Sequence, residues 1–513
     1  MMNENMKKIP AEKFVFAQKD KKIYDTQLET KPIGYFKDAW LRFCKNKSAV
    51  VAFILILFLM LFAIIVPFFS EYDVTFRDGY YKTVLPKSKF FAQFGIWDGC
   101  SNETKPQAGY DYLSSIGVET GRHAVVDVKD VYTDANGTTL YDMKVDSYNK
   151  VGFVFLNLNE NEYASLQEYQ NNTGIQVMYP IQNNHDVDYV MGNGGANFWY
   201  KLVDENYTTG GEAIYDENGN YIPNYMTTDA AEYNNYTSTR IEGDNGGEDG
   251  NTWFVYSLKN QSGYKVRLDY HEYFVYKNGF EPVFLFGTNI YGQDIFTCLA
   301  SAARLSFLLA FSVSFINFVL GACYGAIEGY YGGVLDIAMQ RFSEILGSVP
   351  FIVAATLFQM HLAEQVGVLG SLLFAFVLTG WIGMSNRVRM QFYRFKGQEY
   401  VLAARTLGAR DRRLIFKHIF PNSLGTIITG SVLAIPGVIF SESMLSYLGI
   451  INLETSSLTS IGTMLSNGQG YLSTFPHIIL FPAIFISVLE ISFNLFGNGL
   501  RDAFNPSLRG ADE

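Results

Sequence analysis

The sequence is poor in the residues that build metal sites, disulfide frameworks and catalytic clusters. Its 513 residues include four cysteines and six histidines. The cysteines are far apart, form no CxxC pair and have no histidine cluster beside them, which argues against a zinc site or a disulfide framework. The chain also lacks a G-x-x-x-x-G-K-[ST] loop, so it supplies no ATPase of its own. We therefore predict no catalytic residue, no metal and no cofactor.

Charged residues are also scarce, at 17% of the chain, and they are unevenly distributed. Of the 50 Asp+Glu and 39 Lys+Arg, 31 acids and 15 bases lie between Glu71 and Ile290, which gives this segment a net charge of −16. The remainder is net +5, so the total of −11 adds two unlike parts. The acidic segment also holds 24 of the 34 tyrosines. This balance excludes a net-basic nucleic-acid binder.

Long uncharged runs outside the acidic segment predict membrane-spanning helices and exclude a simple soluble globule. Ala49–Phe69 has 21 residues without a charge, and at about 1.5 Å per residue it spans roughly 30 Å. It follows 48 mostly polar residues, so we interpret it as an uncleaved anchor rather than a signal peptide. Serines in the second run favour a packed bundle. The five further expected spans are Leu305–Ile327, Leu346–Leu362, Gly367–Met384, Leu424–Phe440 and Ile478–Gly497.

Positive charges in the short loops predict the orientation of these spans. Residues 31–47 carry five Lys/Arg against one acid, and residues 385–422 carry nine against two. Residues 361–368 and 441–477 carry no Lys or Arg. Six spans with a cytoplasmic N-terminus place the first two stretches inside and the other two outside, in agreement with the charges. Both termini are then cytoplasmic, and residues 70–300 are extracellular.

The acidic segment has the pattern of a small α+β domain rather than a linker. Tyr163, Leu166 and Tyr169 lie on one helical stripe, so we expect these tyrosines in a core. The other elements follow from strand and turn signals. We expect strands at Val151–Leu156 and Ile175–Ile181, a helix at Asn159–Gln170 closed by Gly174, a hairpin within Asp130–Tyr148 turning at Asn136-Gly137, and a hairpin of Trp253–Leu258 with Tyr264–Tyr276.

The stretch Glu399–Asn422, EYVLAARTLGARDRRLIFKHIFPN, predicts two short helices on the cytoplasmic side. Gly408 stops the first helix, since glycine adopts a left-handed cap without penalty. Asp411 caps the second helix and Pro421 ends it. From spacing alone, two interpretations stay open: a knob that another protein grips, or an ordinary basic loop. The arginines around the joint are Arg405, Arg410, Arg412 and Arg413.

This 399–422 segment resembles the EAA motif of ABC-importer permeases. Ala403-Ala404, Gly408 and Pro421 fall on the register of that motif, and His418–Asn422 resembles the HILPN ending of the peptide-permease branch. Leu402 stands at the motif's glutamate position, with Glu399 about one turn earlier. The resemblance implies an ATPase-docking site made of Glu399, Ala403, Ala404, Gly408, Arg412, Arg413, Ile419 and Pro421.

Further stretches are similar to the dipeptide/oligopeptide permease family, C-type subunit. Gly287–Ile295 looks like its GTDxxGRD segment, with Asn289 and Gln293 replacing the aspartate and the arginine. The resemblance covers 287–506, and the first span with its lead-in fits the same family. The acidic domain matches only an insertion seen in some members, and no function is carried over to it. The other matching stretches are Arg341–Pro350, Ser441–Gly449 and Asn494–Pro506.

The resemblance implies an all-α polytopic membrane protein with six transmembrane helices, the type I ABC importer permease fold, and an inserted extracellular α+β domain. The implied division of the chain is a cytoplasmic N-terminal segment (1–48), the first transmembrane helix (49–69), the extracellular insertion (70–286), a permease core with five transmembrane helices and the EAA loop (287–506), and a cytoplasmic tail (507–513).

The resemblance also implies a function and partners. The chain would form half of the translocation pore of an ATP-driven importer of di- and oligopeptides in the bacterial plasma membrane. Its partners would be a homologous B-type permease, two ABC ATPase subunits, an extracellular lipid-anchored substrate-binding protein and the lipid bilayer, without nucleic acid. The alternatives are a permease for nickel or another small solute, a membrane-tethered extracellular receptor module, and a secondary transporter, which would require inverted repeats.

Two carboxylates fall inside the expected spans. Glu442 lies at the outer end of the fifth span and Glu490 lies within the sixth. Intramembrane carboxylates are costly and usually face the bundle interior or water. We expect each either to line the pore, in contact with the peptide amino group or the partner permease, to be hydrogen-bonded for helix packing, or simply to reach the membrane interface.

Overall fold

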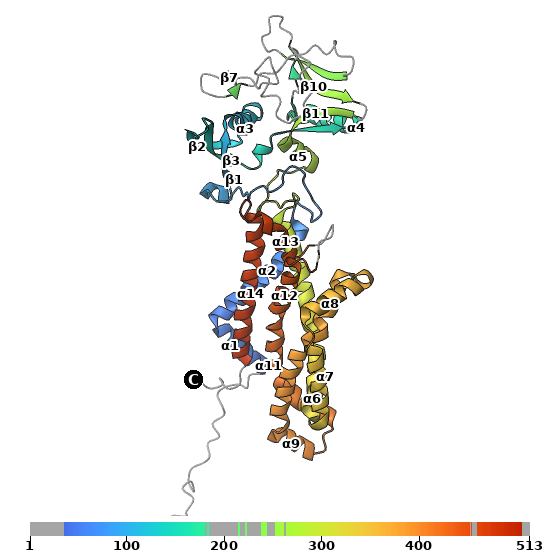
Figure 1. Cartoon of the computed structure of the whole chain (residues 1–513). Helices are drawn as coiled ribbons and strands as arrows, with labels where there is room; N and C mark the ends of the chain where they lie inside the picture. Colours follow the sequence, from blue (N-terminus) through green and yellow to red (C-terminus); the bar gives the residue numbers. More distant parts are fainter. Residues whose placement is uncertain are drawn as a thin grey trace, which may run out of the picture.

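The computed structural model describes residues 35–179, 182–183, 214–215, 221–222, 237–243, 252–260, 263–451, 453 and 459–504. Figure 1 shows two regions, a long helical bundle and a mixed α/β region at one end of it, which is built from the insertion. The described part of the chain is therefore mostly helical, with its strands gathered outside the bundle.

Five helical segments within the described residues are long and apolar enough to cross a membrane. Pro67 and Pro482 lie inside their helices, and Pro436 lies in the first turn of α12. The predicted first span coincides with the helix α2 almost residue for residue. The five segments are α2 (Lys47–Phe69), α6 (Ile295–Tyr331), α8 (Phe351–Lys396), the run Asp411–Tyr447 through α11 (Phe420–Val432) and α12 (Ala434–Tyr447), and α14 (His477–Phe504).

The third and fourth predicted spans both fall in α8, which folds back on itself. Gly367 interrupts the helix with φ 79° and ψ 162°, a conformation open to glycine. The Ser371 hydroxyl donates a hydrogen bond to Gln359 Oε1 at 2.7 Å, and the rings of Phe351 and Phe376 lie 4.7 Å apart. Neither contact is reachable in a straight helix that rises about 1.5 Å per residue. α8 is therefore a helical hairpin with arms 351–366 and 368–396.

The packing of α6 against the second arm of α8 depends on small residues. Gly321, Gly325 and Gly329 recur every four positions on one face of α6. A Cβ atom on Gly325 would overlap the Ser385 carbonyl of α8, and its two neighbours are equally confined. Such spacing lets two membrane helices approach closely. The packed bundle predicted from the serines of this span is confirmed, since Ser306 and Ser314 are buried.

The remaining bundle helices support these spans. α1 (Tyr35–Lys45) packs on α2 and α14 through Phe43, which contacts Phe496 at a ring distance of 5.5 Å. α7 (Gly333–Gly347) lies beside α6 and α8 (Figure 1). α13 (Ile461–Gly468) packs between α12, α6 and α14.

The described residues of the α/β region form three sheets and three α-helices. Its sheets are β1-β3-β2, a six-stranded sheet with the path β4-β11-β10-β6 to which β5 and β9 add, and the pair β7-β8. The elements are β1 (Cys100–Pro106), α3 (Gln107–Thr120), β2 (Val125–Thr133), β3 (Thr139–Asp146), β4 (Phe153–Leu158), α4 (Glu160–Thr173), β5 (Met178–Tyr179), β6 (Gln182–Asn183), β7 (Ile214–Tyr215), β8 (Tyr221–Ile222), β9 (Thr237–Gly243), β10 (Thr252–Asn260), β11 (Gly263–Asp269) and α5 (Tyr270–Asn278).

Most of the local predictions in this region are confirmed, and two are wrong in extent. The strand predicted at Ile175–Ile181 is only the two-residue β5 (Met178–Tyr179) within the described residues. Gly137 turns the β2–β3 hairpin with φ 82°, Asn260 pairs with Gly263 at the β10–β11 turn, and α4 ends at Gly174. The second arm of the β10–β11 hairpin was predicted to run to Tyr276, yet it ends at Asp269. There the Asp269 carboxylate accepts a hydrogen bond from the amide of His271 and caps α5.

Tyrosines fill the core of the α/β region, as predicted for Tyr163. This side chain is buried and stacks on Tyr264 at a ring distance of 4.2 Å, whereas Tyr169 is half-buried. Other tyrosines behave in the same way: Tyr148 donates a hydrogen bond to the Leu85 carbonyl at 2.9 Å. The buried aromatic members of this core are Tyr72, Tyr81, Tyr148, Tyr163, Tyr270, Phe274 and Phe284.

Ion pairs fix the periphery of the same region. Arg122, at the end of α3, contacts both Asp269 and Glu272 of α5. Lys144 of β3 contacts Asp98 at 2.5 Å. Burial opposes ionisation of Asp98, but hydrogen bonds from Lys144 and the Cys100 amide hold the pKa of Asp98 below its usual range.

The junction between the two regions is tightly closed around the loop that precedes α6. The amide of Asp78 donates to the Gly292 carbonyl at 3.1 Å, and the Thr288 hydroxyl donates to the Tyr81 carbonyl at 2.7 Å. Gly292 has φ 73°, and a Cβ there would overlap the backbone of Asp78. The first residues of the insertion therefore share a backbone hydrogen-bond network with the entry to α6.

Candidate functional site

The 399–422 segment connects the second arm of α8 to α11 at the end of the bundle far from the α/β region (Figure 1). It begins with α9 (Glu399–Thr406). Gly408 follows with φ 85°, and the amide of Ala409 donates to the Ala404 carbonyl at 3.0 Å. The predicted glycine stop is confirmed.

The second half of the segment differs from the prediction. Arg410, rather than Asp411, occupies the cap of α10 (Asp411–Arg413), and Asp411 instead accepts a hydrogen bond from the Tyr330 hydroxyl at 2.5 Å. Pro421 does not end a helix, since α11 continues from Phe420 to Val432. A π-helical turn, η5 (Leu414–Ile419), precedes the proline. Its wider hydrogen-bond spacing accommodates the missing amide and bulky ring of Pro421.

Buried apolar side chains hold the segment on the bundle. Val401, Leu414 and Ile419 are fully buried in a cluster with residues of α6 and α8. Around this cluster, the guanidinium of Arg405 lies 5.9 Å from the ring centre of Tyr330, the residue that binds Asp411. Ile419, predicted as part of the docking site, is thus an internal anchor of the segment.

The outward face of the segment is apolar at its centre and basic at its edge. Leu407 is 88% exposed and Phe416 is 63% exposed, although neither was singled out from the sequence. Leu402, at the motif's glutamate position, is 45% exposed. A hydrophobic residue that is nearly free of contacts beside a glycine turn is typical of a surface that another protein covers. Of the predicted docking residues, Glu399, Ala403, Gly408, Arg412, Arg413 and Pro421 are exposed, and Ala404 is half-buried.

Glu442 lies within the bundle, enclosed between α12 and α6. It has no exposed surface. Its carboxylate accepts hydrogen bonds from the hydroxyls of Ser306 at 3.0 Å and Ser446 at 3.2 Å, with Ser443 at 3.4 Å. These hydrogen bonds correspond to the helix-packing alternative that the sequence offers for Glu442.

Glu490 lies in a different environment, on α14. The residue is half-buried, and its Oε1 atom has no hydrogen-bond partner among the described residues. A half-buried carboxylate inside a span with an unpaired oxygen is energetically costly. Glu490 is thus less fully hydrogen-bonded than Glu442 within the described part of the chain.

Two cavities open near the ends of the bundle. The larger, of about 450 Å³, lies between α8, α11 and α14 and is lined by Arg387, Arg394 and Arg501. Arg387 donates to the Gly430 carbonyl at 2.9 Å, which fixes one wall. In the sequence, Arg387 and Arg394 count only as orientation signals and Arg501 belongs to the matching stretch Asn494–Pro506, because nothing in their spacing places α14 beside α8.

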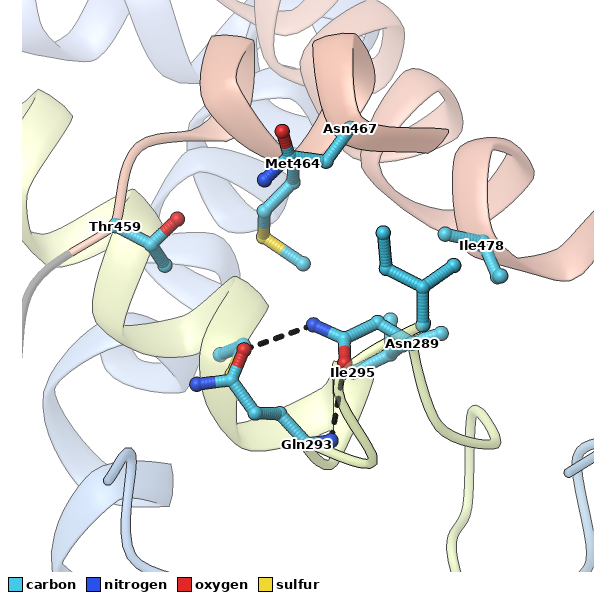
Figure 2. A pocket seen from close by; sticks show the side chains of 9 residues that line it. Asn289, Gln293, Ile295, Thr459, Met464, Asn467 and Ile478 are labelled. Carbon is cyan, nitrogen blue, oxygen red and sulfur yellow. Dashed lines mark hydrogen bonds between the residues drawn. The ribbon is translucent and has the colours of Figure 1, made fainter. Parts of the chain in front are cut away.

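The smaller cavity, of about 20 Å³, lies beside the loop before α6 and has room for about one water molecule. Figure 2 shows Asn289 and Gln293 on one wall, facing Met464 and Asn467 of α13. The side-chain amide of Asn289 donates to Gln293 Oε1 at 2.9 Å, and the Gln293 backbone amide donates to Asn289 Oδ1 at 3.0 Å. The pair thus replaces the family's aspartate and arginine with a neutral contact. No group of three or more His, Cys, Asp or Glu side chains among the described residues could hold a metal.

Family models match both ends of the bundle sequence. Residues 317–510 match the "binding-protein-dependent transport system inner membrane component" model. Residues 34–86 match the "N-terminal TM domain of oligopeptide transport permease C" model. The first covers most of the bundle, including the 399–422 segment.

Individual proteins agree with these models. The chain is 41% identical over 224 residues to the oligopeptide transport system permease protein OppC of Bacillus subtilis, covering 44% of this chain and 72% of the relative. It is 38% identical over 225 residues to the dipeptide transport system permease protein DppC of the same organism, covering 44% and 69%. A chain of the inward-facing MetNI methionine ABC transporter is 15% identical, with 40% of this chain and 96% of that chain covered and a TM-score of 0.33.

Proposed function

Because the chain belongs to the C-type permease family of dipeptide and oligopeptide transport systems, we propose that it forms half of the pore of an ATP-driven peptide importer. The observation that carries the proposal is the match to relatives named as oligopeptide and dipeptide permeases at 41% and 38% identity. Since these relatives are transport components, the chain itself performs no chemical step. Peptides are the substrate class by analogy with the names of those relatives.

The proposed topology has six crossings, with the termini in the cytoplasm and the insertion outside. The helical hairpin of α8 supports the count, because its first arm together with α7 and its second arm each supply one crossing. The charges support the orientation, because the 399–422 segment belongs to a stretch with nine Lys/Arg. The proposed domain limits are those of the sequence: 49–69, 70–286 and 287–506 between the two cytoplasmic ends.

The proposed partners are two ATPases, a B-type permease and a lipid-anchored substrate-binding protein. The ATPase contact is assigned to the exposed face of the 399–422 segment. In this chain the exposed Leu402, which stands where the family motif has a glutamate, and the exposed Leu407 supply apolar contacts. Arg412 and Arg413 supply charge. Motion of the docked ATPase reaches the pore through Tyr330 and the buried anchors Val401, Leu414 and Ile419. Glu490 is the candidate for a pore contact.

The docking assignment predicts that the double variant Arg412→Glu/Arg413→Glu loses its ATPases. Both side chains are exposed, so the exchange reverses the charge of the surface without removing a buried contact. We expect co-purification of tagged ATPase subunits with the assembled transporter to fall several-fold. The matched control is Lys37→Glu/Lys45→Glu on α1, which makes the same change in charge at exposed cytoplasmic positions. Undiminished co-purification, from a variant that elutes as a folded complex, would remove the assignment.

A further inference from the structure

A closed loop near the start of the insertion, residues 88–97, has a composition unlike the rest of that region. We call it the aromatic loop. Its base is held by the bridge between Lys87 and Asp98, and the amide of Ser88 donates to the Trp97 carbonyl at 2.8 Å. A 3₁₀ turn, η2 (Phe91–Phe94), forms its tip, and Gly95 follows with φ 72°. The loop is thus an ordered structure with a fixed base.

The side chains at the tip of the aromatic loop point away from the protein. Phe90 is 64% exposed, Phe94 67% and Ile96 58%, and Phe91 is 40% exposed. The phenyl rings contact one another, with ring distances of 5.2 Å from Phe90 to Phe91 and 5.7 Å from Phe90 to Phe94. Four large apolar side chains gathered on one ordered loop form a patch that water solvates poorly, and such patches mark contact surfaces.

The position of the loop indicates what covers the patch. Trp97 lies edge-on to both Phe286 and Phe481, each at a ring distance of 5.9 Å, and these two rings stack at 4.1 Å. Phe481 belongs to the first turns of α14, one of the membrane-spanning helices. In Figure 1, β1, which follows the loop in sequence, lies just beyond that end of α14. The patch therefore lies at the level where the spans leave the membrane.

The surface of the nearby spans continues this patch. Leu480 and Ile484 of α14 are 50% and 49% exposed, and Phe68 and Phe69 at the end of α2 are 74% and 83% exposed. In a multi-pass membrane protein such side chains face lipid or another subunit. Trp97 at this level is typical of the belt of tryptophan and tyrosine at the membrane surface, and phenylalanine is among the residues with which interfacial segments enter the headgroup boundary.

The charge of the segment also fits a lipid surface. Residues 82–97 hold three lysines and no acid, although they belong to a segment with a net charge of −16. The Lys89 side chain is 79% exposed beside the phenylalanines and pairs with the exposed Glu281 at 2.6 Å, and Lys87 pairs with Asp146 at 2.9 Å. Most of the insertion would be repelled by anionic headgroups, whereas this stretch, which has lysines and no acid of its own, would be repelled less.

We propose that the aromatic loop inserts its phenylalanines into the lipid headgroup region beside the end of α14, and so anchors the insertion to the membrane surface. The anchor would limit tilting of the α/β region relative to the bilayer. This role is independent of the substrate and of the ATPase contact proposed above.

The test places a fluorescent probe on the loop of the full-length chain in nanodiscs of phosphatidylcholine and phosphatidylglycerol. Phe94→Cys is labelled with the environment-sensitive dye NBD after Cys44, Cys100 and Cys323 are replaced by serine. We expect blue-shifted emission, and several-fold stronger quenching by headgroup-proximal spin-labelled lipid than at the control Val131→Cys. Val131 is 50% exposed on β2, where it pairs with Tyr141 of β3.

A second labelled position protects the experiment from a folding defect. Lys89→Cys leaves all the aromatic side chains in place, and we expect it to be quenched by lipid as well. Quenching equal to that of the Val131 site at both positions would overturn the proposal. So would a probe that stays accessible to aqueous iodide in nanodiscs and becomes shielded only when the partner permease or a binding protein is added, because a protein would then cover the patch.

Discussion

The bundle and the α/β insertion accommodate their buried polar groups in opposite ways. In the insertion, acids meet cations: Arg122 contacts Asp269 and Glu272, and Lys144 contacts Asp98. In the bundle, Glu442 is surrounded by serine hydroxyls and Glu490 has an oxygen without a partner among the described residues. Among the described residues of the bundle, cation–carboxylate pairs join Arg389 to Asp336 at 2.5 Å, Arg341 to Glu344 at 2.6 Å and Arg42 to Asp38 at 3.0 Å, and of these three the Arg389–Asp336 pair is the most buried.

The difference follows from what surrounds each region. Helices in a membrane gain little from apolar contact alone, so close backbone approach and hydroxyl bonds join them. A region in water gains from burying aromatic rings, and ion pairs at its edge orient the elements. The two regions therefore respond to different substitutions, which the following predictions use.

The largest effect is expected from Gly325→Leu in α6. The new side chain would overlap the Ser385 backbone and force α6 away from α8. Overpacking of this kind costs about 3 kcal/mol when backbone must move. We expect the purified chain in detergent to lose its monodisperse elution at a markedly lower temperature than the wild type.

The control for that variant is Gly383→Leu on α8, where a Cβ would meet nothing within 4 Å. It adds the same side chain to the same helix pair and should leave the melting behaviour near the wild type. Equal destabilisation by both variants would show that glycine spacing is not what joins α6 to α8.

An intermediate effect is expected from Arg122→Met in the insertion. The change leaves Asp269, whose side chain is 4% exposed, without its cation. Removing one partner of a largely buried pair costs several kcal/mol, and the 27% exposure of Arg122 reduces this to about 2 kcal/mol. We expect faster hydrogen–deuterium exchange in α5, measured on the full chain, with no change in ATPase binding.

Lys89→Met is the matched comparison, because Lys89 and Glu281 form an ion pair whose side chains are 79% and 56% exposed. An exposed pair contributes little, so exchange in α5 should stay unchanged. If the two variants changed exchange in α5 equally, burial would not explain how much each ion pair stabilises the insertion.

The smallest effect on stability is expected from Glu490→Gln. The substitution removes a charge from a half-buried site where Oε1 has no described partner, so we expect a change within about 0.5 kcal/mol. If Glu490 contacts the peptide or the partner permease, uptake of labelled peptide by the reconstituted transporter falls. Wild-type uptake would exclude Glu490 from the transport path. Glu442→Gln tests the same loss of charge where serines enclose the group.

The sequence was sufficient to predict local structure where a residue acts through its own backbone preference. Gly408, Gly137 and Gly174 are all left-handed at the predicted places. The helix α5 could have been found as well. Asp269, Glu272 and Gly279 form a cap, a first-turn acid and a stop, and Tyr270, Tyr273 and Tyr276 recur at helical spacing.

Other features depend on contacts between distant segments, which no local pattern contains. The π-helical turn before Pro421 exists where Leu414 and Ile419 reach into the cluster on α6 and α8. Exposure of Leu407 is likewise a property of the packed bundle, since the sequence presents it as one more leucine in a helix. The arginines of the larger cavity meet only after α8 and α14 are packed against α11.

α6 has a consequence for how the molecule moves. Its 37 residues make a rod of about 55 Å. At one end it is fastened to the root of the insertion, where the hydroxyls of Thr297 and Ser70 lie 2.6 Å apart, and at the other Tyr330 holds Asp411. A stiff rod that tilts by about 10° around its middle moves each end by about 5 Å, in opposite directions. The root of the insertion and the 399–422 segment, which contact opposite ends of α6, are therefore coupled through this one helix.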